Sequence, residues 1–125
     1  TDFTERLLRP ALSQHQLEEL EQKGLTELPT AYQDSPYIIG KNLLDEGRNH
    51  LLLSSRIDID CPVCMVHGTA DVDVPPEFSQ ETLERISPGH RTRLLLIEAG
   101  DHRLSRPEHL GFITDALATM INEVR

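Results

Sequence analysis

Residues 62–78, PVCMVHGTADVDVPPEF, pass from an apolar run through a loop of acidic and turn-forming residues to a pair of prolines. The run Pro62–His67 is short and bounded by turn residues, which predicts a strand buried on both faces. Pro75 and Pro76 suit the first turn of a helix. The apolar residues that follow extend this predicted helix to Ser87, where Ser-Pro-Gly ends it.

The last third of the chain repeats this order of elements. Residues 92–100, TRLLLIEAG, predict a second buried strand that ends at Gly100. Ser105 and Glu108 have the spacing of a capping box, and apolar residues then recur every three or four positions to Val124. Strand, loop and helix therefore alternate twice. This alternation predicts an α/β fold with a parallel sheet covered by helices.

The first sixty residues have the pattern of helices. Ser13 and Gln16 form a second capping-box pattern and Gly24 is a natural stop, so we expect a helix over about residues 14–23. Residues 24–40, GLTELPTAYQDSPYIIG, contain two prolines and no sustained period, which predicts an irregular connection. The spacing of apolar residues then predicts another helix over about residues 40–53.

Composition and charge exclude several classes of protein. The 125 residues are 38% hydrophobic and 26% charged, as in an ordinary globular protein. A net charge of -9 disfavours binding to nucleic acid, because such binding needs basic side chains to displace counterions. The sequence predicts no membrane span and shows no leader segment. With two cysteines predicted to be reduced, the default compartment is the cytoplasm.

The two cysteines stand in a single Cys-Pro-Val-Cys, at Cys61 and Cys64. A redox dithiol, half of a zinc site and two buried packing thiols are the alternatives, and we favour packing thiols. On a strand the two side chains would be roughly 10 Å apart, beyond the ~7 Å limit of a disulfide. The histidines supply no second ligand pair for zinc. A glutaredoxin-like dithiol would instead predict a helix starting at Cys61.

Acidic residues and a histidine follow the two predicted strands. In open α/β sheets the working site lies beyond the carboxyl ends of the strands. Asp71 and Asp73 follow the first strand, and Asp101 and His102 follow the second. An acid that accepts from one imidazole nitrogen lets the other nitrogen take a proton from a nucleophile. The sequence therefore offers two of the three groups of a catalytic triad.

The third group, a nucleophile on a sharp Gly-x-Ser-x-Gly turn, is not encoded in this chain. None of the serines has the flanking glycines; these residues are Ser13, Ser35, Ser54, Ser55, Ser79, Ser87 and Ser105. The simpler interpretation of the acids is an Asx-turn and a surface hydrogen bond. We expect His67 to orient the turn, Asp101 to act as loop scaffolding, and Asp73 to be the second choice for the orienting acid.

Two segments carry a resemblance to a known family. HGTADVDVP, residues 67–75, resembles the H-G-x-x-D-x-x-V-P segment of α/β-hydrolases, and GDHRLSRPE, residues 100–108, resembles their G-x-H loop. The resemblance places the triad acid on Asp71 and the base on His102. LTELPTAY, NHLLLSSRIDIDCPV and DHRLS are similar to the branch of palmitoyl-protein thioesterases and acyl-glucuronide esterases, with its bacterial relatives.

The resemblance implies the carboxyl-terminal half of an α/β-hydrolase. Residues 1–58 would be a helical lid insertion, and residues 59–125 would be the last two strands of a mostly parallel sheet with their helices. The enzyme would be a serine hydrolase that acts on acyl esters or thioesters without cofactor or metal. Its serine and the remainder of the core would lie outside this chain, in the same or another polypeptide. Candidate substrate-lining residues, each equally explained by packing, are Leu7, Leu8, Tyr32 and Tyr37.

A non-enzymatic alternative stays open at this point. Because the chain encodes no nucleophile, it could be a hydrolase-like fragment or binding module without turnover. Without the remaining strands, the predicted sheet would also expose an apolar edge that favours aggregation or pairing with a partner.

Overall fold

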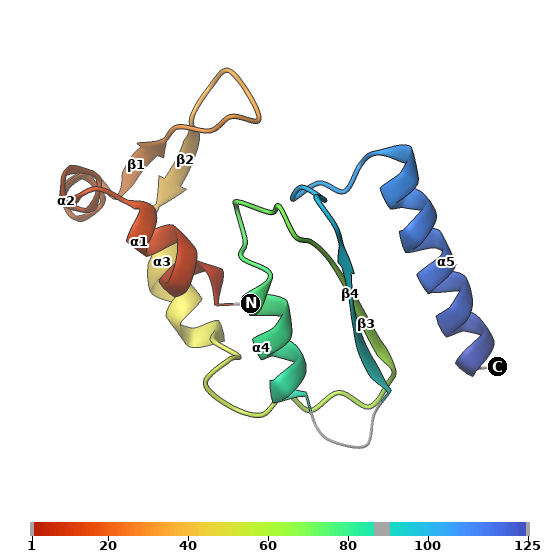
Figure 1. The fold of residues 1–125 in the computed structure, drawn as a ribbon. Helices are drawn as coiled ribbons and strands as arrows, with labels where there is room; N and C mark the ends of the chain where they lie inside the picture. Colours follow the sequence, from red (N-terminus) through yellow and green to blue (C-terminus); the bar gives the residue numbers. More distant parts are fainter. Residues whose placement is uncertain (1, 87–90, 125) are drawn as a thin grey trace. The chain divides into compact units, whose positions relative to one another are not determined.

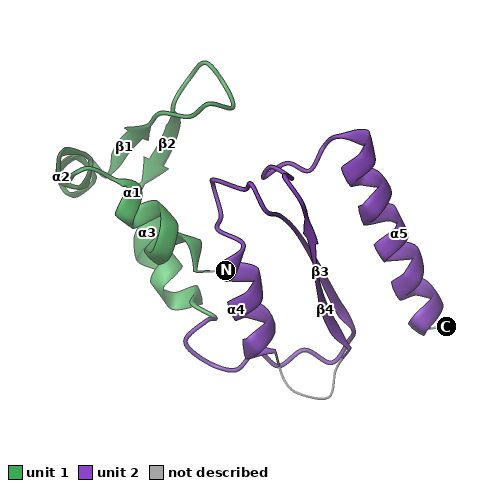
Figure 2. Ribbon diagram, in the orientation of Figure 1, with its two compact units in different colours: residues 1–52 green, residues 53–125 purple. Residues whose placement is uncertain are grey.

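The chain folds into two compact units, residues 1–52 and residues 53–125 (Figure 2). The structure is a computed structural model that describes residues 2–86 and 91–124. Within these residues, no helix combines the length and the apolar content that crossing a bilayer requires.

The second unit is a parallel strand pair with a helix on either side (Figure 1). Its elements are β3 (Val63–Gly68), α4 (Glu77–Arg85), β4 (Thr92–Ile97) and α5 (Pro107–Val124). The strands pair in register from Val63 opposite Thr92 to Gly68 opposite Ile97. Their parallel direction sends both following loops to one edge of the sheet, so the predicted alternation of strands and helices is confirmed.

The ends of these elements differ from the prediction by a few residues. Helix α4 stops at Arg85 because Ile86 is already extended, and the predicted stop at Ser87 lies outside the described residues. Strand β4 stops at Ile97 and not at Gly100. Helix α5 begins at Pro107, one residue later than a cap at Ser105 would give.

A close backbone approach joins the ends of β3 and β4. A Cβ atom placed on Gly68 would lie 2.1 Å from the carbonyl oxygen of Gly100. The amide of Ala70 donates to that same oxygen at 2.9 Å, and the amide of Ala99 donates to Thr69 Oγ1 at 2.9 Å. Two adjacent loops are thereby held against each other at the carboxyl ends of the strands.

The first unit contains the capped helix that the sequence predicts. Helix α2 (Gln14–Lys23) has Ser13 Oγ accepting from the Gln16 amide, while Gln16 Oε1 accepts from the Ser13 amide. Gly24 ends it in a left-handed conformation. The unit also holds a short π-helix Thr4–Leu8, α1 (Arg9–Ala11), β1 (Leu25–Leu28), β2 (Tyr37–Gly40), α3 (Lys41–Gly47) and a 3-10 turn Arg48–His50. Its buried apolar core consists of Leu8, Leu12, Leu20, Ile39 and Leu44.

The expectation of an irregular connection over residues 24–40 was wrong. Strands β1 and β2 form an antiparallel hairpin that runs from Leu25 opposite Gly40 to Leu28 opposite Tyr37. Four-residue strands are too short to show a clear period in the sequence. The buried hydroxyl of Thr26 donates to Glu19 Oε2 at 2.7 Å and ties the hairpin to α2.

The predicted helix over residues 40–53 is shorter in the structure. Helix α3 ends at Gly47, and the chain is extended again at Leu51. The lack of a side chain at Gly47 gives room for Thr4, whose Oγ1 would lie 2.3 Å from an added Cβ. Packing of the amino-terminal turn against α3 therefore requires a residue without a side chain at position 47.

The prediction of two buried packing thiols is partly wrong. Both cysteines are free, but Cys61 is exposed and precedes β3, while Cys64 is half-buried within the strand. Because β3 begins at Val63 as a strand, the helix that a glutaredoxin-like dithiol requires at Cys61 is not present.

The approach of Gly68 to Gly100 predicts a large effect of one added methyl group. We expect Gly68→Ala to lower the free energy of unfolding by about 3 kcal/mol, because the new methyl meets backbone that cannot move aside. Gly111→Ala is the control, since its Cβ would meet nothing within 4 Å and it removes a helical glycine. Urea unfolding of both variants measures the difference. Equal stabilities would show that the two loops are not locked together.

Candidate active site

The carboxylate of Asp71 lies at the carboxyl end of β3 in a tight turn. Its Oδ1 accepts hydrogen bonds from the amides of Asp73 and Val74, both at 2.9 Å. This is the Asx-turn that the residue types allow, and it fixes the side chain by local backbone contacts. Only 4% of the Asp71 side chain is exposed. The turn therefore presents the second oxygen, Oδ2, in a fixed direction.

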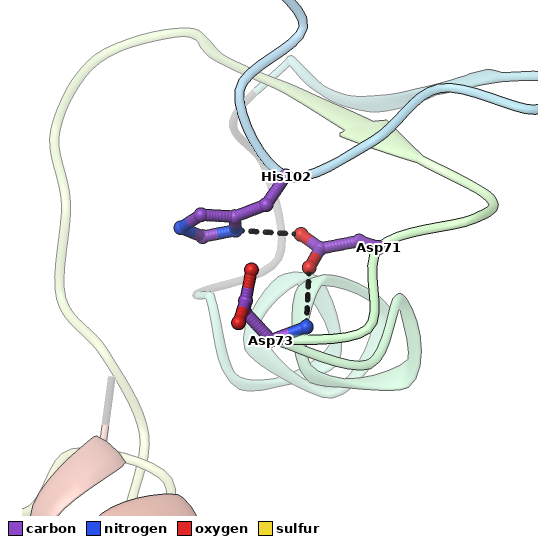
Figure 3. Close-up of side chains that lie close together, drawn as sticks. All are labelled: Asp71, Asp73 and His102. Carbon is purple, nitrogen blue, oxygen red and sulfur yellow. Dashed lines mark hydrogen bonds and ion pairs between the residues drawn. The ribbon is translucent and has the colours of Figure 1, made fainter. Parts of the chain in front are cut away.

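His102 lies opposite this oxygen, on the loop that follows β4. Its Nδ1 points toward Asp71 Oδ2 (Figure 3), and the two atoms are 2.9 Å apart. The His102 side chain is 45% exposed. Because a carboxylate can only accept, the single proton of a neutral His102 ring lies on Nδ1, and Nε2 keeps the lone pair. This is the tautomer that a general base needs in order to take a proton from a hydroxyl.

The loop that carries His102 is held in an unusual backbone conformation. Ala99 and Leu104 both have positive φ angles, 54° and 47°. Asp101 Oδ1 accepts from the amide of Leu104 at 2.9 Å, so Asp101 braces the loop as expected and does not face the histidine it precedes. The buried Leu104 side chain anchors the end of the loop.

His67 is buried next to the acid. Its Nδ1 lies 2.6 Å from Ser79 Oγ, and its Nε2 lies 2.9 Å from the carbonyl oxygen of Val74. The same Nε2 is 3.1 Å from Asp71 Oδ2. The expected role of orienting the turn fits the contact with Val74. The contact with Ser79 on α4 has no signal in the sequence, because twelve residues and a loop separate the two side chains.

The environment of Asp71 favours its charged form. Burial raises the pKa of this carboxyl, but hydrogen bonds from the Val74 amide, His102 and the Asp73 amide, with the attraction of His102, lower it by more. The net effect is a pKa below the usual value for Asp. Asp71 therefore stays ionised opposite His102 at neutral pH.

Asp73 contributes its amide to the turn, and its side chain is exposed. One ligand atom from each of Asp71, Asp73 and His102 lies within 4.8 Å of the others, so the three could surround a cation. Asp71 Oδ2 and His102 Nδ1 are already bonded to each other, however, and a cation would have to displace that bond. The geometry favours the acid–imidazole pair.

The four candidate lining residues lie in the first unit. Leu8 belongs to its buried core, Leu7 is half-buried, and Tyr32 and Tyr37 are each 41% exposed. Packing fully explains the burial of Leu8. Packing in the core does not explain the two exposed tyrosines, so they remain candidates for lining the substrate.

Comparison with known proteins identifies solved structures that share this fold. No protein-family model matches the chain. A hydrolase of Agrobacterium vitis S4 has a solved structure that matches 96% of the chain with a TM-score of 0.89 and 35% sequence identity. The chain belongs to the α/β-hydrolase superfamily. A second solved structure of this superfamily, α/β-hydrolase domain-containing protein 10 from mouse, matches the whole chain with a TM-score of 0.82 and 27% identity.

Curated α/β-hydrolase relatives point to the branch that the sequence resembles. Mouse mitochondrial palmitoyl-protein thioesterase ABHD10 is 32% identical over 108 residues, 85% of this chain, and the human protein is 27% identical over 112 residues. The chain spans 36% of the length of each. It also covers 46% of the Agrobacterium structure and 50% of the mouse structure. The predicted fold, a mostly parallel sheet flanked by helices as in α/β-hydrolases, is confirmed.

The lowered pKa of Asp71 predicts how stability depends on pH. The ionised carboxylate stabilises the folded state above the pKa of an unfolded Asp, about 4, and this contribution is lost as the pH falls through the lower folded pKa. Asp71→Asn should therefore reduce the free energy of unfolding most at neutral pH and least in acid. Urea unfolding of the variant and the unmodified protein, in steps of about one pH unit between roughly pH 3 and pH 7, measures this difference in stability. Asp73→Asn is the exposed control, and an equal pH dependence in both variants would contradict the assignment.

Proposed function

We propose that this chain supplies the acid and the base of a serine hydrolase. The observation that carries the proposal is the bond from His102 Nδ1 to Asp71 Oδ2, made between loops at the carboxyl ends of two parallel strands. The chain order, acid before histidine, also agrees with the α/β-hydrolase pattern. Asp71 would hold the imidazole in one tautomer, and His102 would be the general base.

The proposed reaction is acyl transfer through a covalent intermediate. A serine supplied by a segment outside these residues attacks the acyl carbon, and His102 Nε2 accepts the hydroxyl proton. His102 then gives that proton to the departing alcohol or thiol. In the second half, His102 takes a proton from water, which attacks the acyl-serine, and then returns that proton to the serine oxygen as the acid leaves. Asp71 stabilises the imidazolium in both halves and is not itself protonated.

The substrate class that we propose is an acyl ester or acyl thioester. It is supported by the relatives, which are named palmitoyl-protein thioesterases. Residues 1–58 would act as the lid over the acyl group. Among the lining candidates Leu7, Leu8, Tyr32 and Tyr37, the two exposed tyrosines are favoured, since Leu8 is part of the buried core and Leu7 is half-buried. The curated relatives are named mitochondrial, whereas the cysteine content of this chain gave the cytoplasm as the default expectation, which stays a prediction.

The partner that we propose is the remainder of the hydrolase core. Parallel sheets are normally covered on both faces, yet Leu96 on β4 is 55% exposed and Phe112 on α5 is 59% exposed. Further exposed apolar side chains on α5 are Leu110, Leu117 and Ile121. The share of its relatives that the chain spans, 36%, leaves ample sequence to cover these surfaces.

A second candidate is a hydrolase-like module without turnover. It is favoured by one feature, the lack of a Gly-x-Ser-x-Gly turn in the 125 residues. Labelling of the whole protein with a fluorophosphonate, which reacts with activated serines, separates the two. Labelling that His102→Ala abolishes supports the hydrolase, and no labelling at all supports the module.

The assignment of the acid predicts a contrast between two neighbouring aspartates. In the whole protein, Asp71→Asn should lower kcat for an acyl thioester by about 10⁴, because the imidazole loses both its tautomer and its counter-charge. Asp73→Asn should retain most of the activity, since its side chain is exposed and its amide is unchanged. Equal losses in the two variants would contradict the choice of Asp71.

A further inference from the structure

We propose that His67 is a positioning residue for the active site, and that it acts through Asp71 together with Ser79. This inference rests on the proposed function, because it concerns the acid of the same triad. Ser79, His67, Asp71 and His102 form a continuous chain of polar contacts of 2.6, 3.1 and 2.9 Å. The chain begins on α4, passes through β3 and ends at the proposed base.

The partners of His67 determine its tautomer. Nε2 faces the carbonyl oxygen of Val74 and the carboxylate of Asp71, and both groups can only accept. Nε2 therefore carries the ring proton, and Nδ1 is left with a lone pair. The hydroxyl of Ser79 donates to that lone pair at 2.6 Å. Val74 and Asp71 thus select the tautomer of His67, and the hydroxyl of Ser79 satisfies the lone pair that this tautomer leaves on Nδ1.

Two imidazoles converge on one carboxylate oxygen. Asp71 Oδ2 has His102 Nδ1 at 2.9 Å on one side and His67 Nε2 at 3.1 Å on the other. The other oxygen, Oδ1, accepts the two amides of the turn. Oδ1 is held by the turn and Oδ2 by His102, while the Nε2–H of His67, which donates to the Val74 carbonyl, also lies within 3.1 Å of Oδ2. Rotation of the carboxylate about its Cβ–Cγ bond would break its bonds with His102 and the two amides and move Oδ2 away from His67.

His67 also links the acid to the rigid part of the unit. Asp71 and His102 both belong to loops, which are more mobile than the elements they connect. His67 is buried on β3 with 8% exposed, and Ser79 lies on α4. The position of Oδ2 is therefore set by a strand and a helix as well as by its own turn. A displacement of about 1 Å in such a group can cost on the order of 10² in rate.

Spectroscopy tests the tautomer without reference to activity. In the whole protein labelled with ¹⁵N-histidine, ring correlations should show His67 protonated at Nε2 and unprotonated at Nδ1, with assignments made from His67→Gln. Ser79→Ala should leave His67 protonated at Nε2, because Val74 and Asp71 still face that nitrogen, and should shift only the resonance of the unprotonated Nδ1. An Nδ1-protonated His67 in the unmodified protein would overturn the proposal.

Kinetics test whether the contact reaches the base. His67→Leu fills a similar volume without a donor, and we expect kcat for an acyl thioester to fall about 10²-fold with KM unchanged. His67→Gln can place an amide donor near the position of Nε2 and should recover most of that loss. If folded His67→Leu and His67→Gln have the same kcat as each other, or if the change is confined to KM, His67 is only a packing residue.

The failure of this inference is distinguishable from the failure of the proposed function. If Asp71→Asn and His102→Ala leave activity intact, the triad assignment is wrong. If these two variants are inactive while folded His67→Leu is fully active, the triad stands and the positioning role falls. Thermal unfolding of each variant identifies any that do not fold, and the tautomer measurement then decides the case.

Discussion

The backbone contact between Gly68 and Gly100 is the constraint on which the site depends. The parallel register of β3 and β4 brings both strand ends to one edge, but register alone leaves the loops about one strand spacing, ~4.8 Å, apart. Without side chains at these two positions, the backbones approach until Ala70 donates to the Gly100 carbonyl. Asp71 and His102 each follow within three residues of a contacting glycine, so their side chains meet. The meeting of these two side chains is in this sense a product of main-chain packing.

The second half of the chain could be predicted from sequence because its signals are local and strong. Apolar runs between turn residues mark β3 and β4, and a sustained helical period marks α5. The meeting of Asp71 and His102 follows from parallel topology, which the alternation of elements already implies. The contact between His67 and Ser79 could not be predicted, because it depends on where α4 packs against the sheet.

The first half shows where local signals fail. The capping box at Ser13 and Gln16 predicts the start of α2 and Gly24 predicts its end, since the groups in each signal lie within one turn. The hairpin of β1 and β2 was missed because its strands pair across a loop rich in proline and polar residues, and its stability comes from tertiary contacts such as Thr26 with Glu19. The length of α3 was overestimated for the same reason. Gly47, where α3 ends, is packed against Thr4, which lies far away in sequence.

The positive φ angles of Ala99 and Leu104 mean that the loop around His102 stores conformational strain. Each non-glycine residue in this region costs roughly 1 kcal/mol relative to an ordinary conformation. The strain is opposed by the Asp101 cap, by the Thr69 hydroxyl and by the burial of Leu104. Selection for thermal stability alone would therefore favour glycine at the exposed position 99, whereas at position 104 the buried leucine side chain contributes more stability than the strain costs. A loop with that glycine would be easier to fold but would hold the imidazole of His102 less rigidly, so stability and the order of this side chain place opposite demands on the segment.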